Sequence, residues 1–181
     1  MSRLRRTYEG PTKIYFVTTN THYRRKLFLD DGLAKVVVNT LLFIQKKRWI
    51  DMIAYVVMPD GLHVMFEITG GKNVSEVVHS LKSYAAQRIN KLRQGRDAML
   101  RQGRDALAMG ENKLIGGASQ PRRYMKKVWQ DSFYDRVVDN WSYLNHLINY
   151  IHYNPVKDGL VDKPEDWKWS SVHIYKKKGY Y

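Results

Sequence analysis

The stretch "IDMIAYVVMPDGLHVMFEIT", residues 50–69, decides the fold. Two runs rich in β-branched and large apolar residues flank Pro59, Asp60 and Gly61, and these three residue types favour a tight turn. We expect residues 50–58 and 63–69 to form two strands that pair as an antiparallel hairpin. A lone histidine, His63, begins the second strand just after the turn.

Around this hairpin the sequence predicts two further strands and three helices. The strands are expected at residues 13–19, "KIYFVTT", and at the end of the extended segment 128–139. The helices are expected at residues 32–47, at 74–92 after the capping residue Asn73, and at 140–154, with Asn140 as the cap and Pro155 just past the end. This order predicts an α+β fold, a ferredoxin-like two-layer sandwich with an antiparallel sheet and helices on one face.

The length of the chain, 181 residues, indicates a single domain over residues 1–181. The unit RQGRDA occurs twice between residues 92 and 108, and several glycines follow it. We expect a Gly/Arg-rich duplicated insertion at about residues 92–118 that is mobile or frayed and carries no chemistry. The residues after about 160 are expected to form a C-terminal tail.

Composition narrows the possible functions. Lys and Arg number 31 against 17 Asp and Glu, which gives a formal net charge of +14 and favours nucleic acid as the partner. A solvated basic surface without a partner is the alternative. Because the chain has no cysteine, disulfides, thiolate metal sites and cysteine nucleophiles are excluded. No run approaches the roughly 20 apolar residues of a membrane span, and no signal peptide is recognisable, so we expect no membrane partner and a cytoplasmic location.

Basic residues occur in clusters with aromatic residues between them, among them Tyr8, Tyr23, Tyr124 and Trp129. This pattern suits phosphate contacts combined with stacking on unpaired bases, each stack being worth about 1–3 kcal/mol. The candidate DNA-binding residues are Arg3, Arg5, Arg6, Arg24, Arg25, Lys26, Arg122, Arg123, Lys126 and Lys127.

Two residues on the last long helix can serve one site. Tyr150 and Asn154 are four positions apart, so their side chains lie on one helical face. Tyr153 borders the same face, and spacing alone does not choose between the two tyrosines. Both tyrosines can also be ordinary packing residues of an amphipathic helix, just as a lone strand histidine can be structural.

Four segments occur in an order that resembles one family. They are "MPDGLHVMFEI" at residues 58–68, "VWQDSFYDRVVD" at 128–139, "YIHYNPVKDGLV" at 150–161 and "PEDWKWSSVHIY" at 164–175. The chain resembles the REP-associated tyrosine transposases, relatives of the one-tyrosine single-strand DNA transposases of small bacterial insertion sequences. The resemblance implies a bacterial protein with an HUH nuclease fold, with single-stranded and hairpin DNA as partners, acting as a monomer rather than a dimer.

The resemblance also implies a site. In the family, two histidines separated by one apolar residue on a strand bind a divalent metal, Mg²⁺ or Mn²⁺, and a helix supplies the tyrosine nucleophile. Tyr150 matches that catalytic tyrosine, and Asn154 matches the position of the third metal ligand. His63 matches the second histidine, whereas Gly61 stands where the first is expected. Strand alternation places positions 61 and 63 on the same face, so the glycine removes one ligand; Asp60 is a conceivable substitute.

The family activity is cleavage and rejoining of DNA through a 5′-phosphotyrosine intermediate, without an organic cofactor. The resemblance implies that the chain is a transposase, a DNA strand-transferring endonuclease. Because Gly61 replaces one metal ligand, we expect its activity to be weakened or lost. We expect Gly61→His to restore metal-dependent cleavage without damage to packing. The alternative is a non-catalytic, domesticated protein that binds DNA or RNA on the same scaffold.

Overall fold

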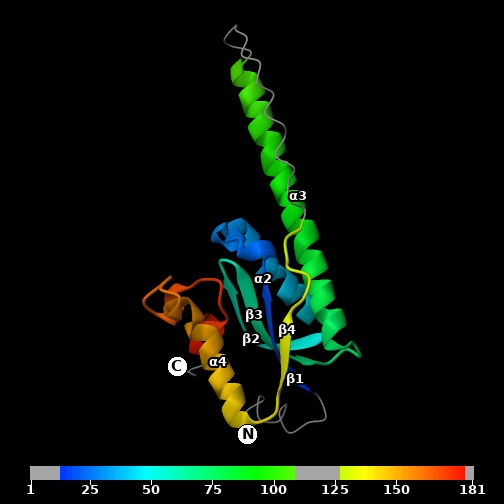
Figure 1. The fold of residues 1–181 in the computed structure, drawn as a ribbon, viewed down its shortest axis with the longest axis vertical. Helices are drawn as coiled ribbons and strands as arrows, with labels where there is room; N and C mark the ends of the chain where they lie inside the picture. The colour runs from blue at the N-terminus through cyan, green and yellow to red at the C-terminus, as the bar shows by residue number, and fades with distance from the viewer. Residues whose placement is uncertain (1–12, 109–126, 178–181) are drawn as a thin grey trace.

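A four-stranded antiparallel sheet forms the centre of the molecule, in the order β2-β3-β1-β4 (Figure 1). The computed structural model describes residues 13–108 and 127–177. The strands are β1 (Ile14–Asn20), β2 (Ile50–Met58), β3 (Gly61–Ile68) and β4 (Tyr134–Val138). The α-helices are α2 (Asp31–Lys46), α3 (Val74–Ala108), α4 (Trp141–Lys157) and α5 (Val172–Lys177), and short 3₁₀ turns are η1 (His22–Arg24), η2 (Leu27–Leu29) and η3 (Pro164–Asp166).

The predicted order of elements is confirmed, including the hairpin. β2 and β3 pair from Ile50 opposite Ile68 to Met58 opposite Gly61. Gly61 therefore belongs to β3, and the turn consists of Pro59 and Asp60 alone. The fold is the expected α+β arrangement of ferredoxin-like strand order.

Helices cover both faces of the sheet, so the prediction of helices on one face is wrong. α2 and α3 bury one set of alternate strand residues, which includes Val17, Val57 and Val64. α4 and α5 bury the opposite set, which includes Phe16 and Met65. β1, β2 and β3 therefore carry apolar residues on both faces. Their alternation shows no polar face, so the sequence could not reveal the second helical layer.

Side-chain caps fix where the helices begin. Asp30 caps α2, because its side chain accepts hydrogen bonds from the backbone N–H groups of Gly32 and Leu33. Asn73 was predicted to cap α3, and it does so in a reciprocal capping box with Glu76: each side chain accepts a hydrogen bond from the other residue's backbone N–H, at 2.9 and 2.8 Å.

α3 is longer than predicted and runs through the duplicated segment to Ala108, well beyond the sheet (Figure 1). The prediction of a frayed segment from residue 92 is therefore wrong up to residue 108; residues 109–118 lie outside the described part. A glycine costs about 1 kcal/mol in a helix, but the Arg, Gln, Ala, Leu and Met residues around Gly95 are good helix formers. Arg96 also forms an ion pair with Asp30, which ties this part of α3 to the start of α2.

α4 also extends past its predicted end, because Pro155 lies inside its last turn. The helix stops at Lys157 through a Schellman motif. Gly159 adopts a left-handed conformation with φ of 67°, its N–H donates to the Val156 carbonyl, and the Leu160 N–H donates to the Pro155 carbonyl. Proline has no backbone N–H, so α4 lacks the hydrogen bond that residue 155 would otherwise donate within its last turn.

The residues after 160 are an integral part of the fold rather than a tail. The backbone N–H of Val57 donates to the Trp169 carbonyl, and Val56 forms a β-bridge with Ser170. Ser171 links three elements, because its hydroxyl bonds the Tyr55 backbone and the buried His152 ring of α4. This segment thereby fastens α4 to the outer strand β2.

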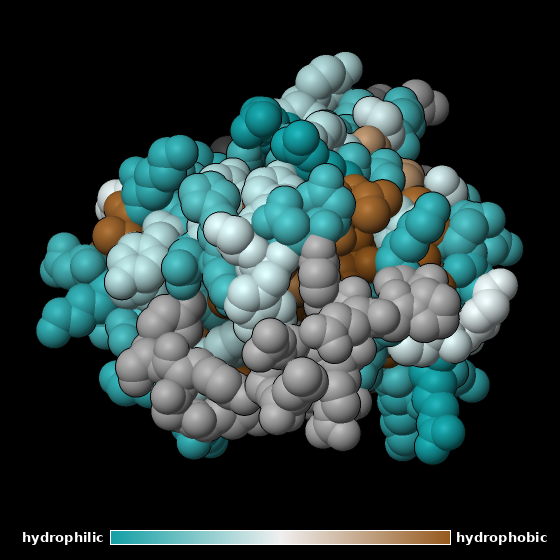
Figure 2. Space-filling view, turned by 90° about the horizontal axis from the view of Figure 1, so that it is seen from below, coloured by the Kyte–Doolittle hydropathy of each residue, from teal (hydrophilic) through white to brown (hydrophobic). Residues whose placement is uncertain are grey.

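The surface is mainly polar. In the view of Figure 2, hydrophilic residues cover most of the coloured face, and hydrophobic residues form only small areas. Among the helices in the described ranges, none is both long and apolar enough to cross a membrane.

Candidate functional site

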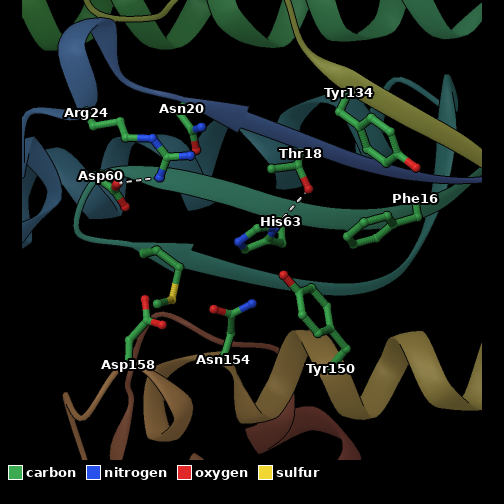
Figure 3. A pocket seen from close by; sticks show the side chains of 11 residues that line it. Phe16, Thr18, Asn20, Arg24, Asp60, His63, Tyr134, Tyr150, Asn154 and Asp158 are labelled. Carbon is green, nitrogen blue, oxygen red and sulfur yellow. Dashed lines mark hydrogen bonds and ion pairs between the residues drawn. The ribbon is translucent and has the colours of Figure 1, made fainter.

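A shallow cavity of about 420 Å³ opens between the sheet and α4 (Figure 3). It lies at the end of the sheet where β1 ends and β3 begins. Its walls come from β1, the loop after it, the β2–β3 hairpin, β4 and α4. The lining residues are Phe16, Thr18, Asn20, Arg24, Met58, Asp60, His63, Tyr134, Tyr150, Asn154 and Asp158.

Strand register explains why these side chains converge. Phe16, Thr18 and Asn20 alternate along β1 and so point to one face of the sheet. Thr18 lies opposite His63 in the antiparallel β1–β3 pair, and Asn20 lies opposite Gly61. The face they share is the one that α4 covers, and α4 brings Tyr150 and Asn154 against it.

His63 is held firmly by its neighbours. A hydrogen bond of 2.8 Å joins Thr18 Oγ1 to His63 Nδ1. The imidazole ring is parallel to Phe16 at 6.2 Å and edge-on to Tyr150 at 5.7 Å, both measured between ring centroids. Burial lowers the pKa of His63 to about 4, partly opposed by the nearby Asp60 and Asp158 carboxylates, so the ring is neutral at neutral pH.

α4 presents its two predicted site residues to the cavity. Tyr150 lines it with a partly exposed ring, over which the Lys157 ammonium lies at 5.9 Å from the centroid. Asn154 is only 6% exposed, and its side-chain nitrogen finds no hydrogen-bond partner among the described residues. A buried amide donor without a partner is costly, which makes Asn154 a ready donor to a bound ligand.

The other candidates on α4 lie elsewhere. Tyr153 is 50% exposed and does not line the cavity. His152 is fully buried on the other side of the helix, where its Nε2 bonds Ser171 Oγ at 2.8 Å. The geometry therefore separates two tyrosines that spacing alone could not.

Charged residues at the rim come from the loop after β1, the hairpin turn and the end of α4. Arg24 forms an ion pair with Asp60 at 3.4 Å, and Asp158 lies at the opposite side of the opening (Figure 3). The guanidinium is largely exposed, so this pair is weak and can rearrange around a phosphate.

Gly61 has a packing role that its sequence position does not suggest. A Cβ atom at this position would lie 2.7 Å from Asn20 Oδ1 and 2.9 Å from the Thr19 carbonyl oxygen. The second neighbour is backbone, so β1 itself would have to move. The expectation that a histidine fits here without damage to packing is therefore wrong, although the backbone of Gly61 is not left-handed.

The described residues do not fit the complete metal site that the resemblance implies. The cavity offers one imidazole, that of His63, the amides of Asn20 and Asn154, and the carboxylates of Asp60 and Asp158, but no side chain at position 61. Within residues 13–108 and 127–177, no three His, Cys, Asp or Glu side chains lie close enough to hold a metal ion. Binding of Mg²⁺ or Mn²⁺ stays a prediction that needs an experiment.

The structure brings together two of the basic clusters. The Arg25 guanidinium donates to the Lys127 backbone carbonyl at 2.6 Å, although 102 positions separate the two residues. Burial, together with the charge of Arg93, lowers the pKa of Arg25. Lys26 is exposed beside them. The remaining candidates, Arg3, Arg5, Arg6, Arg122, Arg123 and Lys126, lie outside the described residues.

Sequence reasoning missed several lining residues. Thr18 and Asn20 could have been found from the alternation of β1, but only once its register against β3 was known. The same holds for Tyr134, which lies opposite Thr18 in the antiparallel β1–β4 pair. Asp158 carried no signal, since the end of α4 was placed before Pro155.

Comparisons with known proteins bear on the family and the fold of the chain. The family model described as "Transposase IS200 like" matches residues 12–103, about half of the chain. A REP-associated tyrosine transposase of Escherichia coli (strain K12) is 25% identical over 183 residues, which cover 100% of this chain and 88% of that protein.

A solved structure of a REP-associated tyrosine transposase bound to a REP hairpin shares the fold. Its TM-score is 0.67 at 22% identity, and the match covers 93% of this chain and 82% of that chain. Taken with the family match, which spans β1 to α3, the chain belongs to the IS200-like transposase family.

Proposed function

We propose that the chain binds hairpin DNA with an unpaired extension and cleaves and rejoins it through a phosphotyrosine on Tyr150. One observation carries this proposal: His63, Tyr150 and Asn154, which come from two distant parts of the chain, line a single cavity. The hairpin bound by the structural relative and the surplus of basic residues support DNA as the substrate.

The residues of the cavity suit a phosphodiester. The Asn154 amide can donate to a phosphate oxygen, and Arg24 can turn from Asp60 to neutralise its charge. Attack of the Tyr150 phenolic oxygen on phosphorus forms the phosphotyrosine bond and breaks the bond to the 3′ oxygen. The phenol loses a proton, the departing 3′ oxygen gains one, and attack by another 3′-hydroxyl reverses the reaction.

Labelled hairpin is incubated with the unmodified chain, Tyr150→Phe and Tyr153→Phe; a native gel of each mixture measures binding, and a denaturing gel measures cleavage and the covalent adduct. Because position 61 carries no metal ligand, we expect a weak covalent adduct with the unmodified chain and with Tyr153→Phe, and none with Tyr150→Phe. Each reaction is run with Mg²⁺, with Mn²⁺ and with EDTA, which tests the metal requirement. An adduct that survives Tyr150→Phe and disappears with Tyr153→Phe contradicts the choice of nucleophile.

A non-catalytic binding role is the second candidate, and the close packing at Gly61 favours it. Position 61 carries no metal ligand, and a Cβ there would press on the backbone of β1, so a ligand can be introduced by substitution only if β1 shifts. Tight binding of the hairpin without adduct under any of the three conditions supports this role and contradicts cleavage.

A further inference from the structure

The loop that follows β1 holds an exposed aromatic side chain beside the cavity. We propose that Tyr23, backed by His22, is a stacking platform for one unpaired base of the DNA extension that enters the cavity. This inference rests on the proposed function and adds to it a base-binding subsite outside the cavity wall.

The backbone of this loop is strained. Tyr23 and Arg24 are consecutive residues in the left-handed region, with φ of 57° and 48°. Each such conformation of a residue other than glycine is disfavoured and persists only when its surroundings impose it. Strain of this kind concentrates at ligand-binding and catalytic positions. The side chains that this loop exposes are therefore candidates for ligand binding.

An extensive set of hydrogen bonds imposes the conformation. The Thr21 hydroxyl donates to the Arg25 carbonyl at 2.6 Å, and the Arg25 Nε donates back to the His22 carbonyl at 2.9 Å. The backbone N–H groups of Thr21 and His22 donate to the carbonyls of Asp60 and Val128, both at 2.8 Å. The loop is thus fixed from both flanks, by the hairpin turn and by the segment before β4.

This rigid loop displays the Tyr23 ring to solvent. The residue is 79% exposed, so the fixed backbone of the loop holds the ring out to solvent. The His22 ring lies 4.1 Å from the Tyr23 ring between centroids, at a tilt of 40°, and supports it from one side. The opposite face of the tyrosine is left to accept a planar partner.

The surroundings of the loop indicate which planar partner fits. Arg24, the next residue, lines the cavity that contains Tyr150, so the loop that carries Tyr23 reaches the cavity wall. Arg25 and Lys26 follow, and Lys127 lies against Arg25. An exposed aromatic ring set among cations matches the alternating bases and phosphates of an unpaired strand, because any base can stack and each phosphate meets a positive charge.

The test uses hairpin DNA whose unpaired extension carries 2-aminopurine, with the same hairpin lacking the extension as reference. Tyr23→Phe keeps the ring, whereas Tyr23→Gly removes it and suits the left-handed backbone better than tyrosine does. We expect Tyr23→Gly to weaken binding of the extended hairpin about 5- to 150-fold and to restore 2-aminopurine fluorescence that the unmodified chain quenches. Tyr23→Phe and the control Tyr153→Ala should behave as the unmodified chain.

Binding of the hairpin without extension should be the same for all four proteins. If Tyr23→Gly binds the extended hairpin as tightly as the unmodified chain, the platform is refuted while the proposed function stands. If Tyr23→Gly weakens both hairpins equally, the residue supports the loop and not a base, which also refutes the platform. If the unmodified chain binds neither hairpin, the proposed function and the platform fail together.

Discussion

Gly61 is the first residue of β3, and the end of β1 passes close beside it. Strand alternation correctly places positions 61 and 63 on one face of β3. What alternation cannot show is that the end of β1 approaches Gly61 so closely that even a methyl group would collide with Asn20 and the Thr19 carbonyl. The glycine is therefore part of the packing between the strands.

We expect Gly61→Ala to destabilise the fold by about 1–3 kcal/mol, because the added methyl overpacks a contact with backbone. The measurement is the free energy of unfolding from urea denaturation. Gly95→Ala is the matched control: a Cβ there meets nothing within 4 Å, and alanine should stabilise α3 by up to about 1 kcal/mol. A neutral Gly61→Ala would show that β1 moves easily, and Gly61→His would then be worth testing for cleavage.

His152 predicts a dependence of stability on pH. Burial, reinforced by the charge of His173, lowers the pKa of His152 to about 4 from an ordinary value of 6.5. Between about pH 6.5 and pH 4 the His152 side chain is protonated in the unfolded chain but neutral in the folded chain. The free energy of unfolding therefore falls as the pH drops through this range, by up to about 3 kcal/mol. His63 adds an effect of the same sign.

Urea denaturation at pH 7 and pH 5 measures this effect. His152→Gln should lose less stability between the two pH values than the unmodified chain, and the part that remains is due to His63 and other groups. An identical loss in both proteins would show that His152 is protonated in the folded state.

The three central site residues could be predicted, because strand and helix periodicities and a family motif all point to them. His63, Tyr150 and Asn154 do converge on one cavity. Thr18, which bonds His63, could not be predicted, since partnership across a sheet depends on register and the sequence of one strand does not specify its neighbour.

At the scale of elements, α4 determines whether the site exists, since it carries both Tyr150 and Asn154. Its start is fixed by Asn140, whose side-chain oxygen accepts a hydrogen bond from the Tyr143 N–H at 2.7 Å. The hydrogen bond between His152 and Ser171 holds one face of α4 against the segment that follows residue 160. The left-handed conformation of Gly159 ends the helix.

Loss of the cap should weaken α4. We expect Asn140→Ala to lower the free energy of unfolding by about 0.5–2 kcal/mol, whereas Asn140→Ser, which keeps an acceptor and places no second carboxylate beside Asp139, should change it less. Chemical denaturation of the three proteins provides the comparison. If alanine and serine behave alike, the start of α4 is stabilised by packing and the cap is dispensable.

Elements with strong local signals were predicted well, and those that depend on tertiary contacts were not. The hairpin and the Asn73 cap follow from adjacent residues. The continuation of α3 depends on its nucleated start and on the distant pair of Arg96 with Asp30. The packing of Trp169 and Ser170 on β2 depends on a partner more than 100 positions away, which periodicity cannot reveal.

At the scale of the whole molecule, the net charge of +14 predicts strongly salt-dependent binding. If the protein neutralises six or more phosphates, its affinity for hairpin DNA should fall by about 10³-fold between 50 and 200 mM salt. A hairpin with an unpaired extension should bind more tightly than plain duplex at every salt concentration. Fluorescence anisotropy titrations measure the salt dependence and the affinity for each DNA. Equal affinity for the extended hairpin and the plain duplex would show that the protein binds DNA only through non-specific electrostatic attraction.

The central claim is that the unpaired strand enters the cavity between the sheet and α4, whether or not it is cleaved there. Photocrosslinking tests this claim most directly, with 4-thiothymidine placed in the extension next to the hairpin and the crosslinked peptides identified by mass spectrometry. We predict crosslinks within β1 and the loop that follows it, residues 14–25, and within α4, residues 141–157. Crosslinks confined to α2 or to the exposed length of α3 would contradict the account.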